Sequence, residues 1–188
     1  AFEGCAKLST VFLPEDLKTI QLDAFKGCGL TDFYLPASVT SFWSDPFPYC
    51  FKLKSITVDA GNPVFSSLDG VLFNKNQTEL CKFPTARAGS YRIPHGVKTI
   101  KEYSFHGASG LTAISIPSTV SGIEGHAFND CNNLTSLTIP ASLNYLGPSA
   151  FSSCDTLQQA VFIGDSPTLS LSFFTFASRA LLALMEPA

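Results

Sequence analysis

The sequence predicts a β-rich solenoid, a chain wound into coils that stack on one another, and three observations support this class. First, a sequence segment is repeated: LTAISIPSTV at 111–120 closely matches LTSLTIPASL at 134–143. Second, the phenylalanines Phe105, Phe128 and Phe151 stand 23 residues apart. Third, a cysteine follows the repeated phenylalanine after three residues in most copies, at Cys5, Cys28, Cys50, Cys131 and Cys154.

One unit reads LxxIxIPxxVxxIxxxAFxxC, and a period in the low twenties with this leucine pattern is typical of a leucine-rich repeat. The LxxIxI segment alternates like a short strand, with apolar side chains inward and Ser or Thr outward. The proline has no N–H to donate and ends the strand. Because one unit cannot cover its own apolar side, neighbouring units stack with their strands parallel, about 4.8 Å apart.

These features predict a right-handed solenoid with coils of about 23 residues and a parallel strand ladder on its concave face. The repeated phenylalanines should stack inside it. Five residues separate Ile20 from Phe25, and also Ile123 from Phe128, which leaves little room for a long helix. We therefore expect a convex side of extended segments and short helical turns.

At 188 residues, of which 45% are apolar and 14% charged, the chain is expected to form a single solenoid domain over 1–188. Regular coils occupy 1–58 and 93–162. Residues 59–92 depart from the repeat, and there GVLF and ELCKF flank NKNQT, which predicts a β-hairpin. We interpret 59–92 as an elongated repeat, because so few residues cannot build a core of their own. Residues 163–188 lose the proline and the cysteine and form a degenerate end.

Composition and sequence pattern argue against several classes of function. The net charge of −3 gives no basic surface for nucleic acid. The longest apolar run near the end, at 180–185, is far shorter than the roughly 20 residues of a membrane helix. The opening AFEGC does not resemble a signal peptide, and since the chain starts within a repeat we read it as a piece of a longer protein.

We expect no enzyme, no catalytic residue, no metal site and no cofactor. Neither a Gly-rich phosphate loop nor a nucleophile elbow is present, and no CxxC motif or His cluster indicates zinc. A catalytic histidine would need a nucleophile and an orienting carboxylate, and His95, His106 and His126 show no such grouping. His106 and His126 fall in neighbouring coils and could approach one another, although surface turn positions explain them equally well.

Six cysteines raise the question of disulfides. Five of them share one phase of the repeat, so their side chains should point the same way into the core. Parallel Cβ directions fit the S–S torsion poorly. We therefore expect free, buried cysteines, with Cys81 in the predicted hairpin partly exposed.

The outward positions of the strand ladder are the candidate binding surface, since solenoids bind through such faces. Phe12 and Tyr34 fall on adjacent coils as an aromatic pair, and aromatic side chains in a polar surround are typical anchors. Alternatively, hydroxyls simply suit exposed strands and Phe12 only covers Tyr34. The candidate ligand-binding residues are Thr10, Phe12, Asp32, Tyr34, Ser55, Thr57, Ser115, Ser136 and Thr138.

The recurring IPxSVxxIxxxAFxxC and the elongated unit FSSLDGVLFNKNQTELCKFP, followed by GSYRIPHGVKTI, closely resemble the BspA-like leucine-rich repeat family over about residues 1–162. Trp43 in place of a small residue, and Ala108 in place of cysteine, depart from the pattern. The resemblance implies a cell-surface or secreted protein of the kind found in mucosal bacteria and some parasitic protists. Such proteins are regarded as adhesins for host extracellular-matrix proteins or other microbes.

Our first hypothesis is therefore a non-enzymatic adhesion module that binds a host or microbial surface or matrix protein through the strand face. The alternative is a structural scaffold that self-assembles through the ends of the solenoid. The ligand and the oligomeric state stay open. Glycosylation at Asn76 or Asn133, each in a sequon, would matter only in a eukaryotic secretory route.

Overall fold

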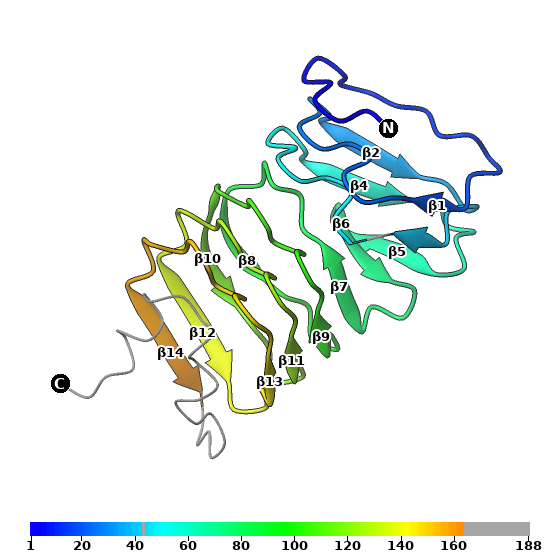
Figure 1. Cartoon of the computed structure of the whole chain (residues 1–188). Coiled ribbons are helices and arrows are strands. Elements are labelled where there is room, and N and C mark those ends of the chain that lie inside the picture. Colours follow the sequence, from blue (N-terminus) through cyan, green and yellow to red (C-terminus); the bar gives the residue numbers. More distant parts are fainter. Residues whose placement is uncertain (43, 164–188) are drawn as a thin grey trace.

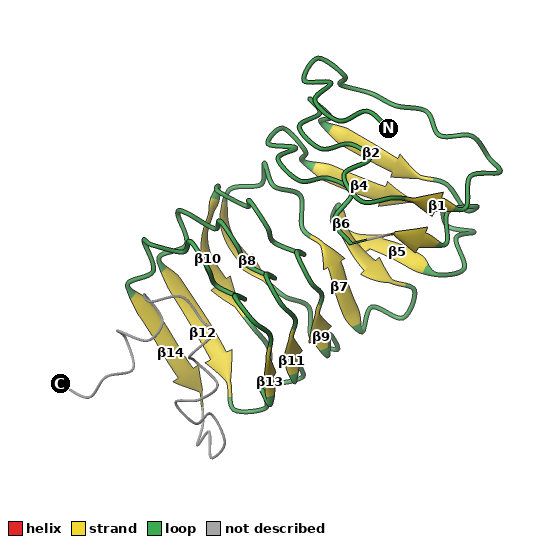
Figure 2. Cartoon of the chain, viewed as in Figure 1, coloured by secondary structure: helices red, strands yellow, loops and turns green. Residues whose placement is uncertain are grey.

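The structure is a computed structural model that describes residues 1–42 and 44–163, and these residues form a β-solenoid (Figure 1). No helix occurs in the described part of the chain, where strands alternate with turns and loops (Figure 2). Successive coils of about 23 residues bring parallel strands side by side. The predicted β-rich leucine-rich repeat solenoid is confirmed. The predicted degenerate end, 163–188, lies outside the described residues except for Ile163.

The strands of the LxxIxI segments form the first ladder. β2 pairs with β4 in parallel, and β8, β10, β12 and β14 form a second parallel set. Side chains alternate between outward and buried positions, as in β2, where Phe33 and Leu35 are buried while Asp32 and Tyr34 are exposed. The strands are β2 Asp32–Leu35, β4 Ser55–Val58, β8 Gly89–Arg92, β10 Leu111–Ser115, β12 Ser136–Pro140 and β14 Gln159–Ile163.

A second ladder of two-residue strands runs along the convex side, where the sequence predicts extended segments. β1 pairs with β3, and β9, β11 and β13 pair in sequence, all in parallel. Each strand contributes one inward apolar side chain, for example Ile100 or Ile123. The strands are β1 Thr19–Ile20, β3 Ser41–Phe42, β9 Thr99–Ile100, β11 Gly122–Ile123 and β13 Tyr145–Leu146.

The short helical turns expected on this side are replaced by consecutive β-turns. In the second coil, the Ala24 N–H donates to Gln21 O at 3.2 Å and the Cys28 N–H donates to Phe25 O at 3.0 Å. Asp23, before the phenylalanine, has φ +56°, and Gly27, after it, has φ +68°. A left-handed residue cannot continue a right-handed helix, so the chain turns twice around the phenylalanine without forming one.

The phenylalanines form the predicted internal ladder. Phe105, Phe128 and Phe151 are fully buried and stacked, with ring centroids 4.6 Å and 4.8 Å apart. Phe83 continues the ladder, 4.9 Å from Phe105, although the sequence pattern did not identify it. The buried apolar residues divide into two clusters, one centred on the N-terminal coils and one on the C-terminal coils, and the elongated repeat contributes residues to both.

The elongated repeat contains three antiparallel strands, β5 Phe65–Leu68, β6 Val71–Asn74 and β7 Glu79–Lys82. The predicted hairpin is the β6–β7 pair. Asp69 and Gly70 join β5 to β6 with φ of 49° and 75°, the two positive values of a type I′ turn. β7 then pairs with β9, whereas β8 pairs with β10, so both ladders restart in the last part of the elongated repeat. The division into domains stays a prediction.

The cysteines are free, and each buried thiol has the same partner in the preceding coil. The Cys28 thiol donates to Phe2 O at 3.0 Å and the Cys131 thiol donates to Phe105 O at 3.3 Å. Cys81 is half-buried, as predicted. Cys5 is exposed, since no other coil covers its thiol in the described part of the chain, and the expectation of a buried thiol is wrong there. Four cysteines are buried as expected: Cys28, Cys50, Cys131 and Cys154.

Candidate functional site

The structure divides the predicted strand-face residues into two groups. In the N-terminal group, Asp32 lies beside Ser55 and Tyr34 beside Thr57 on β2 and β4. In the C-terminal group, the strand face carries Ser115, Ser136 and Thr138 on β10 and β12. The elongated repeat separates the groups, because β4 does not pair with β8. The predicted face is therefore not one continuous ladder.

The hydroxyl of Thr138 in the C-terminal group is used by the strands themselves. It donates to Ile114 O at 3.4 Å and accepts from the Ile116 N–H at 3.3 Å. Ser115 and Ser136 are half-buried beside it. This group fits the alternative in which hydroxyls simply suit the strand surface.

The N-terminal group borders a groove of about 740 Å³. Phe12 is 93% exposed and Tyr34 is 51% exposed, and both line it. Ser55 does not line the groove; its hydroxyl lies close to Gly70 of the elongated repeat instead. The structure thus brings together five of the predicted residues, namely Thr10, Phe12, Asp32, Tyr34 and Thr57.

Thr10 and Phe12 reach the groove from a segment that is not a strand. The sequence predicts a strand at this position, but residues 9–13 form no ladder with β2. The Thr31 N–H donates to Ser9 O at a long 3.5 Å, and the segment makes too few backbone hydrogen bonds with β2 for a ladder. Phe12 therefore projects beside the first ladder rather than from it.

The aromatic pair of Phe12 and Tyr34 is not formed, since no ring contact joins them in the described part of the chain. Tyr34 instead donates its phenolic hydrogen bond to Asp59 Oδ2. Asp59 Oδ1 accepts from the Gly61 N–H at 2.7 Å, which fixes the carboxylate. The Tyr34–Asp59 hydrogen bond raises the pKa of Tyr34 and lowers the pKa of Asp59.

The loop that carries Asp59 is anchored by Asn62, which is fully buried. Its amide group donates to Pro36 O at 2.9 Å and to Val39 O at 2.8 Å, which ties the loop to the preceding coil. Sequence reasoning missed Asp59, because it lies just beyond the regular coils. The short Asp-Ala-Gly sequence at 59–61, which favours a turn in which Asp accepts from the backbone, was the available signal.

The chemistry of the groove is acidic and aromatic. Among the described residues, its charged side chains are Glu15, Asp32 and Asp59, and no lysine or arginine lines it. The hydroxyl oxygen of Ser38, on the groove wall, is buried and has no hydrogen-bond partner in the described part of the chain.

His106 and His126 make no ring contact with each other in the described part of the chain. Tyr103 lies between His106 and His126, with ring centroids 5.6 Å and 5.1 Å from theirs. His106 is buried, so a surface turn position does not describe it. Its Nδ1 lies 3.6 Å from Asp45 Oδ2 and its Nε2 lies 3.4 Å from Asp130 Oδ2.

Within residues 1–42 and 44–163, no group of three or more His, Cys, Asp or Glu side chains is arranged to hold a metal ion. None of the described segments is a helix with the length and apolar character that crossing a bilayer requires.

Comparison with solved structures identifies bacterial leucine-rich repeat proteins. A leucine-rich repeat protein from Eubacterium ventriosum ATCC 27560 is 28% identical, with a TM-score of 0.69 over 74% of this chain and 38% of that protein. The pneumococcal vaccine antigen PcpA is 28% identical, with a TM-score of 0.68 over 87% of this chain and 46% of the antigen. The chain thus spans less than half the length of either protein.

A leucine-rich cell surface protein from Faecalibacterium prausnitzii A2-165 is 24% identical, with a TM-score of 0.50. The match covers 88% of this chain and 55% of that protein, and it shows that the two share a fold. No curated protein is significantly similar in sequence. The family model for the BspA type leucine rich repeat region matches six copies, over residues 1–85 and 82–182. Since these matches extend over nearly the whole sequence, the protein belongs to the BspA-type leucine-rich repeat family.

Proposed function

We propose that this chain is a non-enzymatic protein-binding module, exposed at a cell surface or secreted, that binds a host matrix protein or a microbial surface protein in the groove beside β2. Membership of a leucine-rich repeat family supports a protein-interaction module. Similarity to a pneumococcal vaccine antigen supports a surface location. The family resemblance further implies adhesion.

The main support for this binding site is that Phe12 and Tyr34 are both exposed and line the same groove. A phenylalanine that is 93% exposed contributes nothing to the core, and it keeps a full aromatic surface in water. Aromatic side chains at the centre of an interface supply much of its binding energy. The Asp59 hydrogen bond holds the Tyr34 ring in place before a partner arrives, which reduces the entropy cost of binding.

The groove also offers polar recognition. Thr10 and Thr57 provide exposed hydroxyls along its wall. An extended stretch of a partner protein, with apolar side chains against the aromatic rings and backbone groups against the hydroxyls, fits this combination.

Surface plasmon resonance of the monomeric chain over immobilised matrix glycoproteins tests the proposal. The double variant Phe12→Ser with Tyr34→Ser should lose at least about tenfold in affinity, since an aromatic anchor contributes more than about 1.4 kcal/mol. Tyr145→Ser is the matched control, because Tyr145 is equally exposed, at 50%, but lies on β13 away from the groove. Equal binding by the double variant and the control would move the site elsewhere, and concentration-dependent assembly without binding would favour the scaffold.

A further inference from the structure

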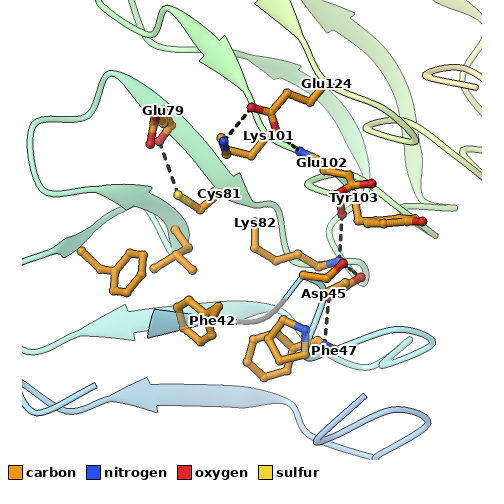
Figure 3. Close-up of a pocket in the computed structure, with 14 residues that line it drawn as sticks. Phe42, Asp45, Phe47, Glu79, Cys81, Lys82, Lys101, Glu102, Tyr103 and Glu124 are labelled. Atoms are coloured by element: carbon orange, nitrogen blue, oxygen red, sulfur yellow. Dashed lines mark hydrogen bonds and ion pairs between the residues drawn. The ribbon is translucent and has the colours of Figure 1, made fainter. Parts of the chain in front are cut away.

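A second hollow, which we call the junction cavity, lies where the second ladder is interrupted. It has a volume of about 300 Å³. Within the described residues, β3 pairs with β1 alone, while β7 pairs with β6 and β9. In a regular coil the next short strand would pair with β3, but the elongated repeat places its hairpin there and leaves a space. Figure 3 shows this space between the strand that carries Phe42 and the strand that carries Cys81 and Lys82.

The inner end of the junction cavity is a buried ion pair. Lys82 Nζ lies 2.6 Å from Asp45 Oδ2, and each side chain is only 3% exposed. Lys82 also donates to Tyr103 O at 3.2 Å, and Asp45 Oδ1 accepts from the Phe47 N–H at 2.9 Å. Burial alone would raise the pKa of Asp45, but the charge of Lys82 and the hydrogen bonds lower it overall. These two charges are therefore matched within the protein.

The walls and the rim of the cavity differ in character. Phe42 and Phe65, with ring centroids 4.8 Å apart, provide an apolar wall, and Leu72 adds to it. At the rim, Lys101 Nζ lies 2.6 Å from Glu124 Oε1, and Glu124 Oε2 accepts from the Glu102 N–H at 3.0 Å.

The lining carries more carboxylates than ammonium groups. Each of its two lysines is bound to one carboxylate, Lys82 to Asp45 and Lys101 to Glu124. Glu79 and Glu102 remain, and neither carboxylate forms an ion pair in the described part of the chain, although Lys101 lies near enough to Glu79 for their charges to interact. Four carboxylates against two lysines leave the lining with a formal charge of −2. The charges of Glu79 and Glu102 are thus available to something outside the protein.

We propose that the junction cavity binds a cationic group at the end of an alkyl chain, such as the side chain of lysine or a free alkylamine. The alkyl part packs against Phe42 and Phe65, and the ammonium group lies at the acidic rim, where Glu79 and Glu102 supply the excess negative charge. Lysine combines an apolar stem with a charged head, which is the combination that this lining complements. Ionised hydrogen bonds of this type are the strong ones, whereas an anion is repelled by the same rim.

This site is independent of the proposed function, because the junction cavity and the groove beside β2 share no lining residue. Isothermal titration calorimetry with three probes tests it: Nα-acetyl-lysine methylamide, 1,5-diaminopentane and Nα-acetyl-norleucine methylamide. Binding of the lysine probe supports a polypeptide source, and binding of the diamine alone supports a free amine. The norleucine probe should bind at least about tenfold more weakly, because it lacks the charge. Absence of binding by both amines, or equal binding by norleucine, overturns the proposal.

Two variants test the location in different ways. Glu79→Gln with Glu102→Gln removes the free charge at the rim and should weaken amine binding at least about tenfold. Cys81→Phe leaves every charge in place and fills part of the hollow, so it should weaken binding through volume alone. Asp32→Asn, in the groove, is the control and should bind like the parent. Circular dichroism checks that each variant is folded, and unchanged amine binding by the folded double glutamine variant overturns the assignment.

Discussion

Replacing Phe128 by alanine tests the internal ladder quantitatively. The ring is fully buried between Phe105 and Phe151, at 4.6 Å and 4.8 Å between centroids. Truncating such a side chain loses its transfer free energy and leaves a cavity, so the free energy of unfolding should fall by about 3–5 kcal/mol. Phe2 is the comparison, because it is 41% exposed and stacks on one ring, that of Phe25.

For Phe2→Ala we expect a loss of about 1–2 kcal/mol, since only part of the roughly 1.5–3 kcal/mol for full burial is at stake. Phe128→Leu serves as the control that keeps most of the volume, at a cost of about 1–1.5 kcal/mol. Urea unfolding followed by circular dichroism gives all three values. The ladder account is refuted if Phe128→Ala costs no more than Phe2→Ala, because nearest-neighbour stacking would then not determine stability.

Four further outcomes are expected. Lys82→Met leaves Asp45 buried without its partner and should lower the free energy of unfolding by about 3–5 kcal/mol in chemical denaturation; a loss below about 1 kcal/mol would mean that the pair is not buried in solution. The pKa of Asp45 is lowered on folding. Its contribution to stability is therefore present above the ordinary pKa of about 4 and is lost as the pH falls through the folded value. As the pH is lowered over that range, the free energy of unfolding of Asp45→Asn should fall less than that of the parent. Mass spectrometry after brief thiol alkylation at pH 8 should find Cys5 modified first, since it is exposed, and a faster reaction of any buried thiol would contradict the packing. In NMR titration the Tyr34 phenol should lose its proton at a higher pH than in Asp59→Asn, because the Asp59 hydrogen bond raises the pKa of Tyr34; identical titration curves would mean that this hydrogen bond is absent.

The repeat encodes the interior, which is why the sequence predicted the solenoid, the strand alternation and the buried cysteines. Phe128 and Cys131 recur at fixed spacing because every coil must bury the same positions against its neighbours. Local conformation was harder to predict. The turn around Phe25 could be a helical turn or two β-turns, and the left-handed φ of Asp23 decides between them.

The repeat pattern does not predict the contacts that the elongated repeat makes. Phe83 belongs to the phenylalanine ladder but follows residues that do not repeat, so its phase could not be counted from Phe47. The Lys82–Asp45 pair joins residues 37 positions apart across that same segment. This ion pair depends on the path of the chain through the elongated repeat, and no local periodicity predicts it.

The candidate site contains one residue that the sequence predicted and one that it did not. Tyr34 was identified because the outward strand position follows directly from alternation. Asp59, which holds it, lies outside the regular coils and came only from the structure. Outward residues do not build the core, so the repeat does not constrain them. Binding therefore depends on a few side chains that the repeat pattern does not predict.

The most direct test of the account follows backbone amide NMR shifts of the chain as a bound matrix-protein fragment is titrated in. The account predicts that the shifts concentrate at residues 10–13, 32–38 and 57–59, which surround the groove. It also predicts that Tyr145 and the strands β10 and β12 stay unchanged. Shifts confined to β10, β12 and β14, with none at Phe12 or Tyr34, would contradict the central claim that the groove is the binding surface.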